Sequence, residues 1–143
     1  MAYWRLFYHL VWATKNREAV LSSTIERELK THLAEKAKAL GCLVHAVGVM
    51  PDHVHVVASV PPAQALSDFV GRLKGGSAHY FNNAANDDRA LLVWQNGYGV
   101  VSFGEKQLPW VVEYVRRQKE HHQDGTELAV LEECQERDAG PNY

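Results

Sequence analysis

Cysteine is scarce in this sequence: only Cys42 and Cys134 occur, far apart and in no metal-ligand spacing. Such thiols are typical of a reducing compartment, and they predict no disulfide. A long hydrophobic run is missing too, because residues 1–13 are apolar but too short to cross a bilayer and are interrupted by Arg5 and His9. No small-residue cleavage site follows this stretch. We therefore expect a cytoplasmic protein with no membrane segment.

A strong excess of basic residues is absent as well, since the net charge is −2. Residues 124–143 hold six acidic residues against Arg137 alone, whereas residues 1–123 hold 14 basic against 11 acidic residues. A mildly basic body is compatible with a polyanion bound in a local groove and gives little support to non-specific coating of duplex DNA. We expect one domain, residues 1–123, followed by an acidic C-terminal tail, residues 124–143.

Runs of β-branched and aromatic residues predict four strands. The first covers residues 3–14. The second and third lie within residues 44–60 and flank a tight Pro-Asp turn. The fourth covers residues 91–103, where an Asn-Gly pair forms either a hairpin turn or a bulge.

Helical periodicity predicts three helices. The first begins at a capping box of Ser23 and Glu26 and ends at Gly41. The second covers residues 63–82, where a Gly-Gly pair indicates a close backbone approach. The third covers residues 109–122 and follows a short linker, so it need not pack on the same sheet. Together these elements predict an α+β fold of the ferredoxin-like, RNA-recognition-like type, an antiparallel sheet with helices on one face and an added C-terminal helix.

Two histidines stand in the third predicted strand. Side chains at i and i+2 leave an extended chain from the same face, so His53 and His55 point the same way. Imidazole is the commonest metal ligand in proteins, and two on one strand supply part of a coordination sphere. For a bare His-x-His pair, the favoured interpretation is two polar residues on a solvent face. A metal site also needs a third ligand, and chemistry needs a reactive group.

The last predicted helix offers both groups. Tyr114 and Gln118 stand four residues apart and share a helix face, toward the edge of a packing face formed by valines. Taken alone, either residue is expected at a helix–sheet seam without a chemical role. A tyrosine hydroxyl is a weak nucleophile that needs a cation or base beside it and a polarised electrophile. A histidine pair, a glutamine oxygen and a tyrosine supply these parts, with a phosphodiester as the electrophile.

Five segments carry a family resemblance: MPDHVHVVASVPP, YHLVWATKNR, LKGGS, WQNGY and EYVRRQKEHH. Together they resemble the single-tyrosine HUH transposases of small insertion sequences, the TnpA type. The specific part is PDHVH followed about 60 residues later by a Tyr-x-x-x-Gln helix. The resemblance implies that His53, His55 and Gln118 hold a divalent metal, Mg²⁺ or Mn²⁺, and that Tyr114 on the C-terminal helix is the catalytic nucleophile.

The same resemblance implies an enzyme, a DNA transposase and single-strand endonuclease. It would cut and rejoin single-stranded DNA at hairpin ends through a covalent 5′-phosphotyrosine. It also implies a homodimer whose sites combine the histidines of one chain with the tyrosine and glutamine of its partner. The residues expected to contact the DNA are basic: Lys15, Arg17, Arg72, Lys74, Arg116 and Arg117.

Two other functions are open on the sequence. One is a non-catalytic nucleic-acid-binding module of the RNA-recognition type, in which Tyr8, Trp12 and Trp94 stack on bases. Such a module has no use for a histidine pair matched to a tyrosine and a glutamine. The other is a host-retained relative that acts on repeated hairpin sequences with the same chemistry.

Overall fold

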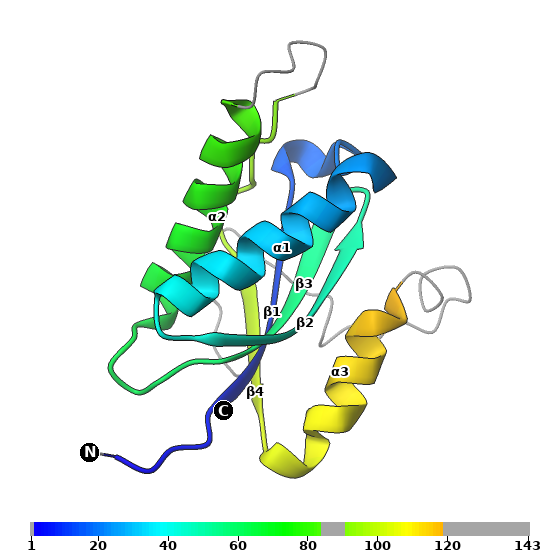
Figure 1. Ribbon diagram of the computed structural model, residues 1–143. Coiled ribbons are helices and arrows are strands. Elements are labelled where there is room, and N and C mark those ends of the chain that lie inside the picture. The colour runs from blue at the N-terminus through cyan, green and yellow to red at the C-terminus, as the bar shows by residue number, and fades with distance from the viewer. Residues whose placement is uncertain (1, 84–90, 119–143) are drawn as a thin grey trace, which may run out of the picture.

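A computed structural model describes residues 2–83 and 91–118 of the chain. Its strands are β1 (Phe7–Ala13), β2 (Leu43–Met50), β3 (His53–Ser59) and β4 (Gly99–Phe103), and they form an antiparallel sheet in the order β2-β3-β1-β4. The helices are α1 (Ser23–Ala39), α2 (Leu66–Asn82) and α3 (Leu108–Arg116) (Figure 1). The predicted α+β class is confirmed.

The larger core lies between the sheet and the pair α1 and α2. Leu10 and Trp12 of β1 are fully buried there, in one cluster with Leu29 and Leu33 of α1 and Phe69 of α2. These residues repeat with period two along the strand and with a helical period along the helices, so each element turns one apolar side inward. Burial of one such side chain contributes roughly 1.5–3 kcal/mol.

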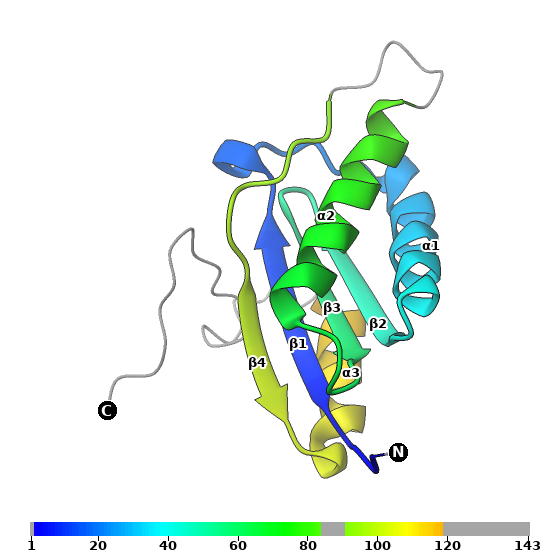
Figure 2. The same ribbon diagram turned by 90° about the vertical axis from the view of Figure 1, so that its left-hand side faces the viewer.

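The opposite face of the sheet is covered by α3. A second, smaller cluster forms there from Ala46, Val57, Val111, Tyr114 and Val115. Figure 2 shows α3 on the far side of the strands from α1 and α2. Because β3 has helices on both faces and strands along both edges, its seven residues are all buried. A strand in this position is expected to be apolar throughout, so the two polar rings that it carries require an explanation.

Contact between α3 and β2 is close because β2 has no side chain at Gly48. A β-carbon there would lie 2.7 Å from the backbone oxygen of Val115 and 3.3 Å from the β-carbon of Gln118. Real β-carbons do not approach a backbone oxygen so closely. Gly48 is therefore required for the observed position of α3, a requirement that the sequence did not suggest.

Several local predictions need correction at the start of the chain. The first strand begins at Phe7, and Tyr3 before it is 83% exposed. The predicted capping box is wrong: Ser22 occupies the N-cap of α1 and makes no side-chain capping bond, because its hydroxyl is hydrogen-bonded to Thr24. The predicted end of α1 is confirmed, with Gly41 in the left-handed region at φ 76°.

The predicted close approach at the glycine pair of α2 is also wrong. A β-carbon at Gly75 would have no neighbour within 4 Å. At Gly76 it would meet the side chains of His32 and Lys36 at 3.5 Å, which is ordinary contact. The close approach in this fold therefore lies at β2.

The predicted fourth strand is shorter than its sequence pattern. Only its second half is β4, whereas the first half makes a single bridge from Trp94 to Thr14. The Lys74 side chain also holds this segment: its Nζ donates to the carbonyls of Gln95 (2.7 Å) and Gly97 (2.9 Å). The Asn-Gly pair thus separates the isolated bridge at Trp94 from β4.

Other predictions fall on parts of the chain outside the described residues. These are the acidic tail, residues 124–143, and residues 119–122 of the third predicted helix. Within the described residues α3 ends at Arg116, where the prediction had the helix continue. Across residues 2–83 and 91–118, no helix is long and apolar enough to cross a membrane.

We predict that Gly48→Ala lowers the free energy of unfolding by about 1–3 kcal/mol, because the new methyl group overpacks the contact with Val115. Urea denaturation measures this change. The matched control is Gly71→Ala on α2, where a β-carbon would meet nothing within 4 Å. There we expect stabilisation by roughly 0.5–1 kcal/mol, since alanine suits a helix interior better than glycine. Equal stability of the Gly48→Ala variant and the wild type would contradict the tight packing of α3.

Candidate active site

The two histidines of β3 lie side by side under α3. Their ring centroids are 5.0 Å apart, and their exposures are 5% for His53 and 0% for His55. The two-residue repeat of a strand puts both on the same face, as predicted. The interpretation that they line a solvent-facing surface is wrong, because that face is covered.

Contacts with β2 and β3 place Tyr114 and Gln118 on this face of the sheet. Tyr114 packs in one cluster with Ala46 and Val57, which are paired across the two strands. Gln118, four residues later, lies against Gly48, and Gly48 is paired with His55. The four-residue step from Tyr114 in α3 to Gln118 just after it therefore matches a two-residue step along β3, taken in the opposite chain direction. Tyr114 and Gln118 are both buried, deeper than the edge position that their spacing had indicated.

The Nδ1 atoms of both histidines are engaged. Oδ1 of Asp52 accepts a hydrogen bond from Nδ1 of His53 (2.7 Å). Nδ1 of His55 lies 2.8 Å from Nε2 of His9 on β1. A ligand histidine in metalloproteins typically has one ring nitrogen held in this way, while the other binds the metal.

Three further side-chain atoms have the chemistry of ligands for a divalent metal. Within the described residues, Nε2 of His53, Nε2 of His55 and Oε1 of Gln118 are buried and make no hydrogen bond. Two imidazole nitrogens and one amide oxygen are a suitable set for such an ion, with coordination positions left over for other ligands.

His9 is the site residue that sequence reasoning missed. It is 1% exposed, and it stands on β1 opposite Val57, diagonally adjacent to His55. Diagonal neighbours on adjacent strands are within reach of long or aromatic side chains. A histidine inside an otherwise apolar strand was the available signal, but its partner depends on which strand lies beside β1.

The exit from β1 holds Asp52 in place. The amide and hydroxyl groups of Thr14 donate to the Asp52 carbonyl at 2.8 and 3.2 Å. Arg17 lies 3.7 Å from the Asp52 carboxylate. Asn16 and Arg17 both adopt the left-handed conformation, at φ 56° and 55°, which is uncommon outside glycine. This turn carries Arg17 back toward the Asp52–His53 pair.

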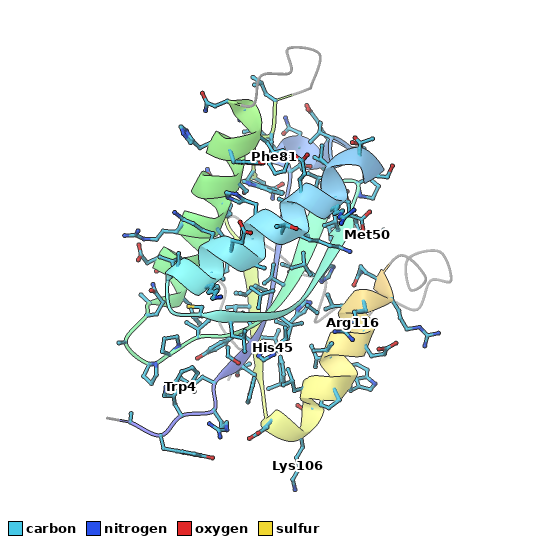
Figure 3. All side chains as sticks on the ribbon, in the orientation of Figure 1. Trp4, His45, Met50, Phe81, Lys106 and Arg116 are labelled. Carbon is cyan, nitrogen blue, oxygen red and sulfur yellow. The ribbon has the colours of Figure 1, made fainter. Side chains whose placement is uncertain are left out.

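The six basic residues expected to contact DNA do not form one surface. Lys15 and Arg17 lie just after β1, and Arg72 lies on α2, 3.3 Å from Asp68. The amine of Lys74 is committed to backbone carbonyls, so it holds the fold together. Arg116, labelled on α3 in Figure 3, and Arg117 after it lie on the α3 side of the sheet, across from α1 and α2.

The aromatic residues expected to stack on bases are placed differently from that prediction. Trp12 is fully buried, and Nε1 of Trp94 donates to the hydroxyl of Ser77 in the core. Tyr8 is half-buried and packs against the same core. The sheet therefore does not present these three rings to bases.

Comparison with known proteins shows the class to which this fold belongs, that of the transposases. The family described as "Transposase IS200 like" matches residues 2–118, and the chain belongs to it. It is thus a DNA-processing enzyme of the transposase type, and the resemblance to TnpA-type transposases is confirmed.

Individual relatives agree with this assignment. The chain is 34% identical to the ISDra2 transposase TnpA of Deinococcus radiodurans, over 80% of this chain and 85% of that protein. It is 26% identical to the transposase for insertion sequence element IS200 of Salmonella typhimurium, over 89% and 86% of the two chains.

Two solved structures resemble the fold. A putative transposase from Deinococcus radiodurans matches with a TM-score of 0.65 and 30% identity, over 90% of this chain and 97% of that chain. A REP-associated tyrosine transposase bound to a REP hairpin matches with a TM-score of 0.62 and 16% identity, over 89% and 76%. The second likeness concerns the fold alone.

Proposed function

We propose that this chain cuts and rejoins single-stranded DNA through Tyr114, with a divalent metal held by His53, His55 and Gln118. The observation that carries the proposal is the convergence of these four residues on one buried sheet face in a member of the IS200-like family. Neither the histidine pair nor the tyrosine helix would suffice alone.

The proposed reaction is the one that the resemblance to single-tyrosine transposases implies. The Tyr114 oxygen attacks a backbone phosphorus, and a 5′-phosphotyrosine bond forms as the bond to the 3′ oxygen breaks. The tyrosine loses its proton and the released 3′ oxygen takes one up to become a hydroxyl, so the step needs no oxidant or energy source. Rejoining is the same exchange in reverse, with a 3′ hydroxyl as the attacking group.

A bound divalent ion, Mg²⁺ or Mn²⁺, supplies Lewis-acid stabilisation of phosphate charge. The protein residues hold and orient the donors: Asp52 fixes the ring of His53, and Gly48 lets α3 approach closely enough for Gln118 to lie beside the histidine row. Trp110 stacks on the Tyr114 ring with centroids 5.8 Å apart and restricts its position. Such pre-positioning lowers the cost of reaching the reactive geometry.

The proposed substrate is single-stranded DNA that folds into a hairpin. Support comes from the structural neighbour that is bound to a REP hairpin. Four exposed basic residues suit phosphate contacts. Lys15 and Arg17 lie near the turn that precedes β3, and Arg116 and Arg117 lie at the end of α3. A host-retained relative acting on repeated hairpins would use the same site and the same chemistry.

We further propose a homodimer in which α3 of one subunit completes the site of the other. In a single chain α3 lies on its own sheet, and residues 104–107 connect it to β4. The same contacts at Gly48 would serve a helix from either subunit. Two-fold dimers are the commonest symmetric assemblies.

We predict that Tyr114→Phe still binds hairpin DNA but forms no covalent adduct, because only the attacking oxygen is removed. The DNA is a single strand from the flanks of the gene, labelled on the 3′ side of the cut, and adducts are resolved on a denaturing gel. Tyr98→Phe is the control, since Tyr98 packs against the core on the α1 and α2 side of the sheet. An adduct in the Tyr114→Phe variant would mean that another residue is the nucleophile.

We predict that a chelator abolishes cleavage and that either Mg²⁺ or Mn²⁺ restores it. His53→Ala and His55→Ala should each reduce cleavage below detection, because each removes a ligand from a three-ligand set. The control is His32→Ala on α1, whose ring stacks on Tyr80 away from the site. Circular dichroism checks that the variants fold. Wild-type cleavage rates in both ligand variants would rule out this metal site.

A mixing experiment tests the assembly: inactive His53→Ala protein is combined with inactive Tyr114→Phe protein and subunits are allowed to exchange. If α3 is shared between subunits, each heterodimer carries one intact site and one doubly defective site. An equal mixture should then recover about one quarter of wild-type activity. If each site is built within one chain, every site keeps one defect and the mixture stays inactive.

A further inference from the structure

His9 has no role in the proposed reaction, but its burial within an apolar strand needs an explanation. It is a polar residue in the middle of β1, 1% exposed, between neighbours that are apolar. Its ring centroid is 4.9 Å from that of His55, and the two rings meet through Nε2 of His9 and Nδ1 of His55 at 2.8 Å. A buried polar side chain is costly unless it makes such bonds, and an apolar residue would suit this strand better.

We propose that His9 is a positioning residue that holds His55 in the tautomer able to bind metal. The inference deepens the proposed function and rests on it. In this arrangement Nδ1–H of His55 donates to Nε2 of His9, so Nε2 of His55 keeps its lone pair. His9 then carries its own proton on Nδ1.

The opposite arrangement of protons makes the same hydrogen bond but disables the ligand. If Nε2–H of His9 donated to Nδ1 of His55, the proton of His55 would be on Nε2, where a metal must bind. A neutral imidazole has one donor and one acceptor nitrogen, so the bond to His9 decides which nitrogen is available.

The ring of His53 is held in the same way, through Nδ1, but by a different acceptor. Nδ1 of His53 donates to the carboxylate of Asp52, which can only accept when ionised. That carboxylate is reached from outside by Arg17, whereas His55 is fully buried in the sheet. A neutral imidazole serves as the acceptor at the deeper position without the cost of burying a charge.

His9 is not a third histidine ligand in this geometry. In the part of the chain that the structure describes, no three His, Cys, Asp or Glu residues converge where they could hold one metal ion. His9, His53 and His55 therefore do not share an ion. The third donor of the proposed site is an amide oxygen, that of Gln118, and His9 acts through His55.

The test uses full-length protein and two substitutions that separate the acceptor from the packing. His9→Leu fills the space without an acceptor, whereas the side-chain oxygen of His9→Gln can accept from His55 at nearly the position of the lost nitrogen. The control is His45→Leu, which removes a histidine from the other end of the sheet, where its ring is hydrogen-bonded to Ser59 and contacts Phe7 (Figure 3).

The first measurement is Mn²⁺ affinity, determined by electron paramagnetic resonance without DNA. We expect His9→Leu to bind Mn²⁺ about 10- to 100-fold more weakly than wild type, as is typical when an outer-shell partner of a ligand is lost. His9→Gln should recover most of that affinity, and His45→Leu should leave it unchanged. Wild-type affinity in folded His9→Leu protein, with binding still lost in His55→Ala, would overturn the role of His9 and leave the metal site standing.

The second measurement is the tautomer of His55 in metal-free wild-type protein, from long-range proton–nitrogen NMR correlations at a pH where imidazoles are neutral. The proton should be on Nδ1, and in His9→Leu the population with the proton on Nε2 should rise. A wild-type proton on Nε2 would overturn the inference even if His9→Leu fails to fold. Absence of Mn²⁺ binding by wild-type protein would overturn the proposed metal site and the inference together.

Discussion

The close contact between Gly48 and the end of α3 is the constraint on which the site depends. A backbone oxygen of α3 occupies space that any side chain at this position of β2 would fill. The contact puts Gln118 beside the strand pair that carries His55, and one helical turn earlier it puts Tyr114 on the next pair of residues. Four residues of the helical segment cover about the same length as two residues of the strand. The contact at Gly48 therefore sets the positions of both Tyr114 and Gln118.

Burial of the histidines is the second consequence of this packing. With α3 in place the rings lose contact with water, so their hydrogen-bonding groups need partners in the protein. A buried donor or acceptor without a partner costs about 1–3 kcal/mol. Asp52 and His9 provide partners for the two Nδ1 atoms, and these come from the tight turn before β3 and from the adjacent strand β1. The same bonds that reduce the cost of burial fix the orientation of both rings.

Basic residues that are close in the sequence have different roles in the structure. Arg72 and Lys74 are close in sequence, yet Arg72 is at the surface beside Asp68, whereas the Lys74 amine reaches two carbonyls of the segment before β4. Backbone hydrogen bonds at Val93 and Gln95 join that segment to the end of β1, and the partly buried Lys74 amine adds hydrogen bonds to two of its carbonyls. Arg17 is at the surface too, where its half-exposed side chain lies beside the Asp52 carboxylate. Counting basic residues did not distinguish surface charges from charges used within the fold.

The sequence by itself determined the order of strands and helices, the shared face of His53 and His55, and the four-residue spacing of Tyr114 and Gln118. Each of these follows from the period of one element, which is local in the chain. Only the tertiary structure decided that His9 meets His55, that Gly48 admits α3, and that Tyr114 is buried in the packing face. These depend on register and contact between segments far apart in the chain, and no local period specifies which distant residue will lie opposite.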